Sequence, residues 1–269
     1  HIKRNDRGEI SINDLALPTP STGPEQPETS QNHAEPVKFG VNSLSIEKVN
    51  IRYNETDFTQ ENEIVLLQLN NIKSWDAGSI AQLKLELRVN KAPININSEL
   101  RLFDKEKQLK GTLSVAALDF APYKKFYRDH LKQLSGNLNV NSDFDVSLNS
   151  NNDQLLISAQ VTNDIEIASL DLSYQEIRHS TKNIHWQGKT RIKAQGLIEV
   201  SGTLDINDSQ TSDTSNQYQI AAFKQLLVTN IQTDLKSLSI EKLLLEQSRF
   251  VDAEKTGQMI DLEQLSIDQ

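Results

Sequence analysis

The chain has 269 residues, of which 36% are hydrophobic and only 6% aromatic, and its formal net charge is -9. This acidic balance and the lack of a basic block argue against nucleic-acid binding, which needs clustered Lys and Arg to neutralise phosphates. The chain contains no cysteine, which excludes disulfides and thiolate metal sites. Its length suits either one elongated domain or two compact ones.

The N-terminal part divides into a short strand candidate and a linker. Residues 10–15 (ISINDL) follow a turn-like Asp-Arg-Gly, and we interpret residues 1–17 as the end of a preceding element. Residues 18–36 are rich in Pro, Thr, Ser, Glu and Gln, so they predict a linker that cannot bury enough apolar surface to order itself. Both ends of the chain lie in mid-pattern, and we expect a longer protein that supplies an anchor and a targeting segment.

From Val41 onward, apolar and polar residues alternate in one segment after another. Strand-length segments recur at intervals of roughly 8–15 residues with polar turns between them, which is typical of an all-β chain. A phase slip near Lys48 indicates a bulge. Residues 37–207 predict one β unit, residues 208–217 a polar loop, and residues 218–269 the start of a second, similar unit.

A six-residue identity supports this second unit. The sequence Ser-Leu-Ser-Ile-Glu-Lys occupies residues 43–48 and again residues 237–242, and a phenylalanine follows each copy, at Phe58 and Phe250. Residues 64–69 and 260–265 then share an apolar pattern that includes Gln-Leu at the same place. Such self-similarity is typical of repeat architectures, in which each unit contacts mainly its neighbours.

One segment, residues 122–134, predicts a helix. Pro122 suits a first helical position, and Gly136 can take the left-handed conformation that ends a helix. The large apolar residues between them recur at spacings of three and four and form one stripe. We expect Tyr123, Phe126 and Leu131 to be buried against one edge or end of the sheet.

Catalytic signatures are missing from the sequence. His179 and His185 have neither the spacing of a helical zinc pair nor that of a zinc finger, and we interpret both as surface or turn residues. The carboxylates are scattered over outward strand positions and turns. The sequence has no G-x-S-x-G elbow and no Gly-rich phosphate loop. We therefore expect no enzyme activity, no cofactor and no metal.

The fold predicted from these patterns is mainly β, an elongated, curled antiparallel sheet that forms a groove, with one short helix near residues 122–134. Its apolar strand faces could be the closed core of a β-sandwich or the wall of a trough. The single helix and the few aromatics favour the trough, since a large apolar face must be covered by protein, by a partner or by lipid. Period-two alternation predicts that eight lining residues share one concave surface: Leu85, Leu87, Ile96, Phe144, Val146, Ile157, Ile192 and Ile198.

Three stretches resemble elements of the AsmA-like envelope proteins of Gram-negative bacteria. Residues 118–123 (LDFAPY) and 134–138 (LSGNL) are similar to the family's recurring L-x-L-x-P-Y … L-x-S-G-x-L element. Residues 6–15, followed by the Pro-rich linker, are similar to its D-G-x-x-N-x-x-D-L element, and residues 41–53 to the I-x-x-L-x-I-x-x-x-x-I strand that comes next. The resemblance covers most of the chain.

The resemblance implies a non-enzymatic, bridge-like lipid carrier with a repeating apolar β-groove. It implies transport of phospholipid acyl chains or outer-membrane homeostasis, with partners in the inner and outer membranes. It also implies a periplasmic location, with a tether to the inner membrane through a segment outside this chain. The alternative belongs to a different class: a structural or adhesive β-sandwich repeat module of the cell surface.

Overall fold

The chain forms two units, His1–Pro36 and Val37–Gln269, which we describe separately. The computed structural model describes residues 2–4, 10–12, 15–16, 38–55, 58–127, 130–151, 154–193, 196–215, 218–251 and 259–268. The first unit holds a three-stranded antiparallel sheet of β1 (Ile2–Arg4), β2 (Ile10–Ile12) and β3 (Leu15–Ala16). The short strand predicted over residues 10–15 is therefore present as β2 and the start of β3. The predicted linker, residues 18–36, lies outside the described residues.

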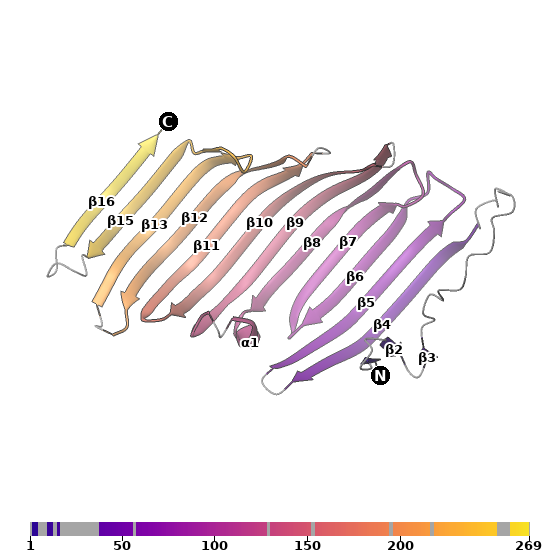
Figure 1. The fold of residues 1–269 in the computed structure, drawn as a ribbon, viewed down its shortest axis with the longest axis horizontal. Coiled ribbons are helices and arrows are strands. Elements are labelled where there is room, and N and C mark those ends of the chain that lie inside the picture. The colour runs from indigo at the N-terminus through magenta and orange to yellow at the C-terminus, as the bar shows by residue number, and fades with distance from the viewer. Residues whose placement is uncertain are drawn as a thin grey trace, which may run out of the picture. The chain divides into compact units, whose positions relative to one another are not determined.

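The second unit is one open antiparallel sheet of 13 strands, which is not closed into a barrel (Figure 1). Neighbouring strands follow the order of the chain, and the short β14 pairs only with the end of β13. This confirms the predicted mainly β, antiparallel fold. The strands are β4 (Gly40–Glu55), β5 (Phe58–Lys73), β6 (Ala81–Val89), β7 (Ala92–Arg101), β8 (Glu106–Asp119), β9 (Gln133–Asn151), β10 (Gln154–Tyr174), β11 (Ile177–Ile192), β12 (Ile198–Asp213), β13 (Tyr218–Thr233), β14 (Leu238–Ser239), β15 (Lys242–Val251) and β16 (Met259–Asp268).

The sheet is a single layer in the part of the chain that the structure describes. Among those residues, only four hydrophobic side chains are buried: Phe58, Ala81, Ala92 and Val228. The apolar residues of the long strands are mostly half-buried, because each is covered by its neighbours on the same face and not by a second layer. A closed sandwich core would bury these side chains fully, so the architecture is that of an uncovered sheet.

A line of backbone irregularities crosses the C-terminal half of the sheet. Ser169, Asp208 and Gln247 have φ angles of 54°, 51° and 44°, in the left-handed region that residues other than glycine seldom adopt. They lie at one height on β10, β12 and β15, as the surrounding pairs show. In β10 the aliphatic positions change there from odd numbers (165, 167) to even numbers (170, 172). The irregularity thus keeps aliphatic side chains on one face although the sequence changes phase.

Buried hydroxyl residues accompany this line. Thr181, Ser209 and Ser248 are 3%, 3% and 2% exposed, which makes them some of the least exposed side chains of the sheet. The Thr181 hydroxyl donates a hydrogen bond of 2.9 Å to the backbone carbonyl of Asn207 on the next strand. The Ser248 Oγ has no hydrogen-bond partner among the described residues. These small side chains fill the places beside the strained residues, where a larger side chain would have less room.

The phase slip predicted near Lys48 is present in β4, because this residue has a positive φ of 57°. The pairing of β4 with β5 keeps the same register on both sides of it, with Glu47 opposite Leu66 and Val49 opposite Ile64. A register shift appears one strand further on, between Ile64 and Leu66 of β5, where β5 pairs with β6. The slip therefore continues as a bulge across the first strands of the sheet.

The predicted helix is present but shorter than residues 122–134. A 3₁₀ turn, η1 (Ala121–Tyr123), leads into α1 (Lys124–Tyr127), and β9 already begins at Gln133. Leu134 pairs with Leu172 of β10, so the last residue of the predicted apolar stripe belongs to a strand. The prediction was wrong about the C-terminal half because a helical spacing of three and a strand spacing of two both fit so short a segment.

The helix lies at one end of the strands, beside the start of β5 (Figure 1). The Phe58 ring is 6.1 Å from the Tyr123 ring and 5.2 Å from the Phe126 ring, centroid to centroid. Burial raises the pKa of Tyr123, and the nearby side chain of Asn90 partly opposes that rise. Tyr123 and Leu131 are half-buried, whereas Phe126 is 68% exposed, which corrects the prediction that all three are buried.

The predicted polar loop, residues 208–217, is mostly strand. β12 continues to Asp213, and Ser209 pairs with both Thr181 and Phe223. Polarity alone suggested a loop because this end of β12 carries hydroxyl and carboxylate residues on both faces. A strand whose end is exposed to solvent on both faces can carry polar residues at successive positions without becoming a loop.

Candidate functional site

One face of the sheet carries a continuous row of large apolar side chains. Residues directly opposite each other in antiparallel strands point to the same face, so the register traces rows across the sheet. One row has a Val, Ile, Leu or Trp on every strand from β4 to β16 except the short β14, and we call it the central apolar row. Its members are Val49, Ile64, Leu87, Ile94, Val115, Val140, Ile165, Trp186, Leu204, Val228, Leu243 and Ile267.

The central apolar row runs perpendicular to the strands. At about 4.8 Å between neighbouring strands, its twelve members span about 53 Å. A second row lies beside it from β8 to β16 and contains only Leu and Ile. Its members are Leu118, Leu138, Ile167, Ile184, Ile206, Leu226, Leu245 and Leu265. Together the two rows make the middle of this face, which we call the apolar face, hydrophobic over the whole length of the sheet.

The structure places all eight predicted lining residues on the apolar face. Leu87 belongs to the central apolar row, and Leu85 and Ile96 are direct partners one row away. The others follow from the same pairing, and no described layer covers any of them. Phe144 lies opposite Val161, Val146 opposite Ala159, Ile157 opposite Leu148, and Ile192 opposite Ala159 and Ile198.

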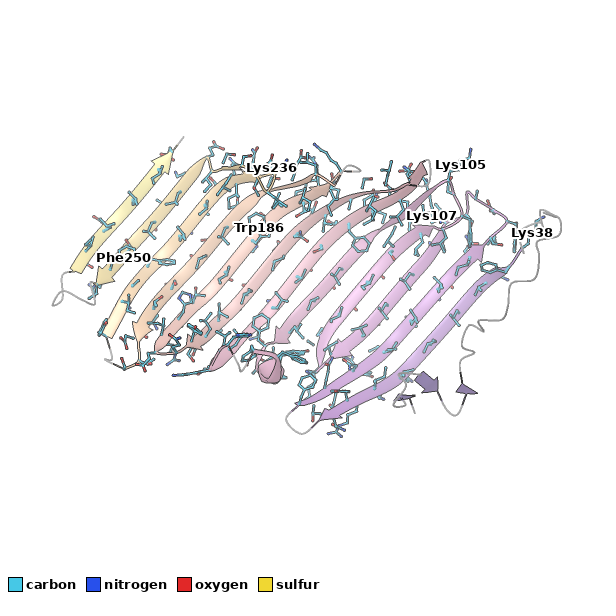
Figure 2. All side chains as sticks on the ribbon, in the orientation of Figure 1. Lys38, Lys105, Lys107, Trp186, Lys236 and Phe250 are labelled. Carbon is cyan, nitrogen blue, oxygen red and sulfur yellow. The ribbon has the colours of Figure 1, made fainter. Side chains whose placement is uncertain are left out.

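The indole of Trp186 lies across a floor of two glycines on this face. A Cβ atom on Gly188 would stand 2.4 Å from Trp186 Cζ2, and one on Gly202 would stand 2.7 Å from Trp186 Cη2. Gly188 and Gly202 are direct partners on β11 and β12. Figure 2 shows Trp186 over the middle of the sheet, away from both long sides. The missing side chains let the ring lie flat without interrupting the row.

Sequence patterns alone did not single out this Trp–Gly arrangement. Gly188 follows Trp186 by two residues, and Gly202 interrupts an alternating strand after Ser201. A glycine inside a strand is a known sign of a close backbone or ring approach. Which ring approaches which glycine depends on the pairing of β11 with β12, and that pairing comes only from the fold.

Lysines line one long side of the sheet. Figure 2 shows Lys38, Lys105, Lys107 and Lys236 at the strand ends along its upper side. All four are exposed, and none of their side chains forms an ion pair with a described residue. Lys107 lies opposite Leu148, so it belongs to the apolar face where that face ends. Four lysines without a described ion pair thus stand along this side, among the carboxylates of Asp104, Glu106 and Asp234.

The opposite face is polar. One row on it contains only hydroxyl, amide and charged residues: Ser45, Gln68, Lys84, Asn97, Thr112, Asp143, Thr162, Lys189, Ser201, Gln232 and Ser239. A cavity of about 500 Å³ opens at its C-terminal end, beside Lys189, Arg191 and Ser201. Its lining is charged and hydroxylated, so it does not suit an apolar ligand.

The two histidines considered in the sequence make ordinary polar contacts on strand β11. The His185 Nε2 lies 2.8 Å from the Asp164 Oδ1, and the His179 Nδ1 lies 3.0 Å from the Thr211 Oγ1. Among the described residues, no group of three or more His, Asp or Glu side chains is arranged to hold a metal ion.

Comparison with known proteins adds no relative. No protein family model, no curated protein and no solved structure matches this chain. Within the described ranges, the structure also contains no helix long and apolar enough to span a bilayer. The functional argument therefore rests on the uncovered apolar face and the lysines along its border.

Proposed function

We propose that this chain is a non-enzymatic envelope protein whose apolar face carries or shields the acyl chains of phospholipids. The observation that supports this most is the central apolar row, which crosses every long strand without a polar member. Soluble proteins seldom leave so long an apolar surface open unless something binds there. An acyl chain lying along the row would cover it.

The geometry suits a flexible hydrocarbon better than a compact ligand. Burying one methylene group contributes about 0.8 kcal/mol to the binding free energy, and the total depends on the contact area alone. A row of similar aliphatic side chains offers an acyl chain the same contact at every position along the row. Binding by such a face needs no reactive group, which agrees with the lack of a catalytic signature in the sequence.

The border of lysines supports a lipid with an anionic head. The side chains of Lys38, Lys105, Lys107 and Lys236 stand at strand ends along one long side of the sheet. The head group of a lipid whose acyl chain extends from that side onto the apolar face would lie beside them. A phosphate there stays in water and gains the attraction of an ammonium group, while the chain stays on the hydrocarbon surface. Phospholipids combine both features.

The cellular setting that we propose comes from the resemblance to AsmA-like proteins. In that setting the chain works in the periplasm, is tethered to the inner membrane by a segment outside this sequence, and serves lipid homeostasis of the outer membrane. The alternative function was a structural or adhesive module built from closed β-sandwiches. The described residues form one layer instead of two, which favours the lipid proposal.

Trp186 offers a direct test, because it is a member of the central apolar row. The chain has two tryptophans, and Trp75 is 54% exposed in the turn after β5. In the Trp75→Phe variant, phospholipid brominated in the middle of its acyl chains should quench the remaining indole emission, and the same lipid without bromine should not. The matched variant Trp186→Phe leaves only Trp75 and should be quenched much less.

The proposal fails if brominated lipid leaves the emission of Trp186 unchanged, or if it quenches Trp75 as strongly as Trp186. Mass spectrometry of lipid extracted from the purified protein gives an independent measurement. We expect phospholipid in amounts comparable to the protein. Its absence from protein purified without detergent would contradict the proposal as well.

A further inference from the structure

Two polar side chains interrupt the apolar face beside the central apolar row. Ser142 lies two residues after Val140 on β9, so it points to the apolar face. Asn163 of β10 is its direct partner on that face, two residues before Ile165. The Ser142 hydroxyl donates a hydrogen bond of 2.7 Å to the Asn163 Oδ1. This contact fixes the amide by its oxygen and leaves its NH₂ group without a partner among the described residues.

A second hydrogen-bond donor lies on the next strand. Gly188 of β11 is the direct partner of Asn163, which places the two Cβ positions about 5 Å apart. A Cβ atom on Gly188 would stand 2.6 Å from Trp186 Cε2, the carbon bonded to the indole nitrogen. The Trp186 Nε1–H therefore lies near the Asn163 amide, and no described residue accepts a hydrogen bond from it. Two N–H donors thus lie at one height of the apolar face.

Hydrocarbon that covers these two donors would bind less well than hydrocarbon elsewhere on the face. On the uncovered face, water can pair with both N–H groups. An acyl chain displaces that water and supplies no acceptor, so the donors lose their hydration without compensation. Their neighbours on the same face include Leu113, Val161 and Ile165, whose side chains carry no acceptor either. A lipid that lies here must bring the acceptor itself.

The ester carbonyls of a glycerolipid are the acceptors that fit this place. A carbonyl oxygen is neutral, so its removal from water costs less than that of a phosphate. The described residues opposite the Ser142–Asn163 pair, and those two positions away from it on the same strands, include no Lys or Arg to pair with a phosphate. Ester groups join the acyl chains to the head group. With the esters at the two donors, the chains can lie along the central apolar row while the head group stays in water.

This place is separate from the side of the sheet that carries the lysines. Lys107 lies opposite Leu148, six residues along β9 from Ser142, or about 20 Å at about 3.4 Å per residue. A lipid whose head group lies beside Lys107 therefore does not reach the two donors with its ester groups. The donors define a second position for a lipid on the apolar face.

We propose that Asn163 and Trp186 bind the ester carbonyls of a diacyl lipid, and that Ser142 is a positioning residue that holds the Asn163 amide with its NH₂ group outward. The site depends on the proposed function and narrows its ligand class from hydrocarbon chains in general to ester-linked lipids. It also predicts where along the apolar face the ester groups of a bound lipid lie.

Competition between two lipids tests the site. The protein is incubated with vesicles that contain equal amounts of dihexadecanoyl phosphatidylglycerol and its dihexadecyl ether analogue, which lacks the two carbonyl groups. Mass spectrometry then measures both lipids in the purified protein. Each carbonyl hydrogen bond contributes about threefold in affinity, so the wild type should hold about tenfold more of the ester lipid.

Substitutions in the site should change this preference in steps. Asn163→Leu removes one donor and should lower the preference to about threefold, and Asn163→Leu/Trp186→Phe removes both and should bind the two lipids equally. Ser142→Ala keeps both donors but releases the amide, and should lower the preference by about twofold. The control is Asn141→Leu, on the adjacent residue of β9 and opposite Asp164 on the polar face, which should keep the preference of the wild type.

The indole proton of Trp186 gives a second measurement that does not depend on the lipid ratio. The Trp75→Phe variant contains a single indole, so its nuclear magnetic resonance spectrum has one indole N–H signal. Loading with the ester lipid should move this signal downfield, because the proton gains a carbonyl acceptor. Loading with the ether analogue should move it upfield, because the proton loses water and gains no acceptor.

Three results would overturn the inference. The first is equal loading of the ester and the ether lipid in the wild type. The second is a preference for the ester that persists in Asn163→Leu/Trp186→Phe. The third is an indole signal that moves in the same way with both lipids. In each of these cases lipid is still bound, so the proposed function stands. If the wild type binds neither lipid, the proposed function fails and the ester site fails with it.

Discussion

A charge in the wall of the apolar face should weaken lipid binding far more than a charge on the other side of the same strand. Val146 is half-buried, and its direct partners Leu109 and Ala159 are apolar. In the variant Val146→Asp the carboxylate must stay hydrated, which keeps about three methylenes of a passing acyl chain in water. At about 0.8 kcal/mol for each methylene, the loss is about 2.4 kcal/mol, or about fiftyfold in affinity.

The control is the next residue along β9. Asp145 points to the polar face, where it accepts a hydrogen bond of 2.8 Å from the Gln108 side chain. Asp145→Lys reverses a charge there and should change lipid affinity by less than about twofold, because the side chain lies on the face that the acyl chain does not touch. Both variants should remain folded, since the new charge at position 146 stands on an uncovered face.

Quenching of Trp186 by acyl-brominated phospholipid, titrated in the Trp75→Phe background, measures the affinity of both variants. Thermal unfolding of each protein establishes that the sheet is intact. A photo-crosslinking residue at position 146 should capture lipid, whereas one at position 145 should not. The reasoning is refuted if the two substitutions weaken binding equally, if Val146→Asp binds like the parent, or if both crosslinkers capture the same amount.

Three further predictions concern stability and are measured by urea unfolding. Gly188→Ala should lower the free energy of unfolding by about 1–3 kcal/mol, because the new Cβ would collide with the indole of Trp186. In the control variant Gly78→Ala the new Cβ would be 3.7 Å from its nearest neighbour, so the free energy of unfolding should hardly change. Equal effects of the two substitutions would contradict the glycine floor. Ser248→Ala removes a buried hydroxyl without a described partner and should leave the free energy of unfolding unchanged. Thr181→Val breaks a hydrogen bond and should lower the free energy of unfolding by about 1–2 kcal/mol. A larger loss for Ser248→Ala than for Thr181→Val would refute this account. Phe58→Ala should lower the free energy of unfolding by about 3 kcal/mol and speed amide hydrogen exchange in η1 and α1. Unchanged exchange in η1 and α1 would show that the Phe58 ring does not hold the helix in place.

The strand pattern could be predicted from the sequence because period-two alternation is a local property. Leu85 and Leu87 differ by two positions, so they must share a face whatever their strand pairs with. The same logic failed beyond Asp208, where a left-handed residue changes the phase and polar residues occupy both faces. The sequence there was interpreted as a loop, although β12 continues to Asp213.

The continuous row could not be predicted, because it depends on pairing between strands that are distant in the sequence. Val115 and Ile165 belong to the same row only because β9 lies between their strands in one particular register. A slip of one residue in any pair would have broken the row. The C-terminal half of the predicted helix could not be predicted for a similar reason. Leu134 fits a helical stripe and a strand equally well, and only its pairing with Leu172 places it in a strand.

The way the rows are built bears on how such a protein could change its length during evolution. Every strand contributes one member to each row, so gain or loss of a hairpin would lengthen or shorten the sheet by about 9.6 Å while its cross-section stays the same. The two copies of the hexapeptide, with ten strands from one to the next and no change of height, are what such growth by duplication would leave behind. A protein of this design can be adjusted to the distance it must cover by counting hairpins, without redesigning the surface that its ligand touches.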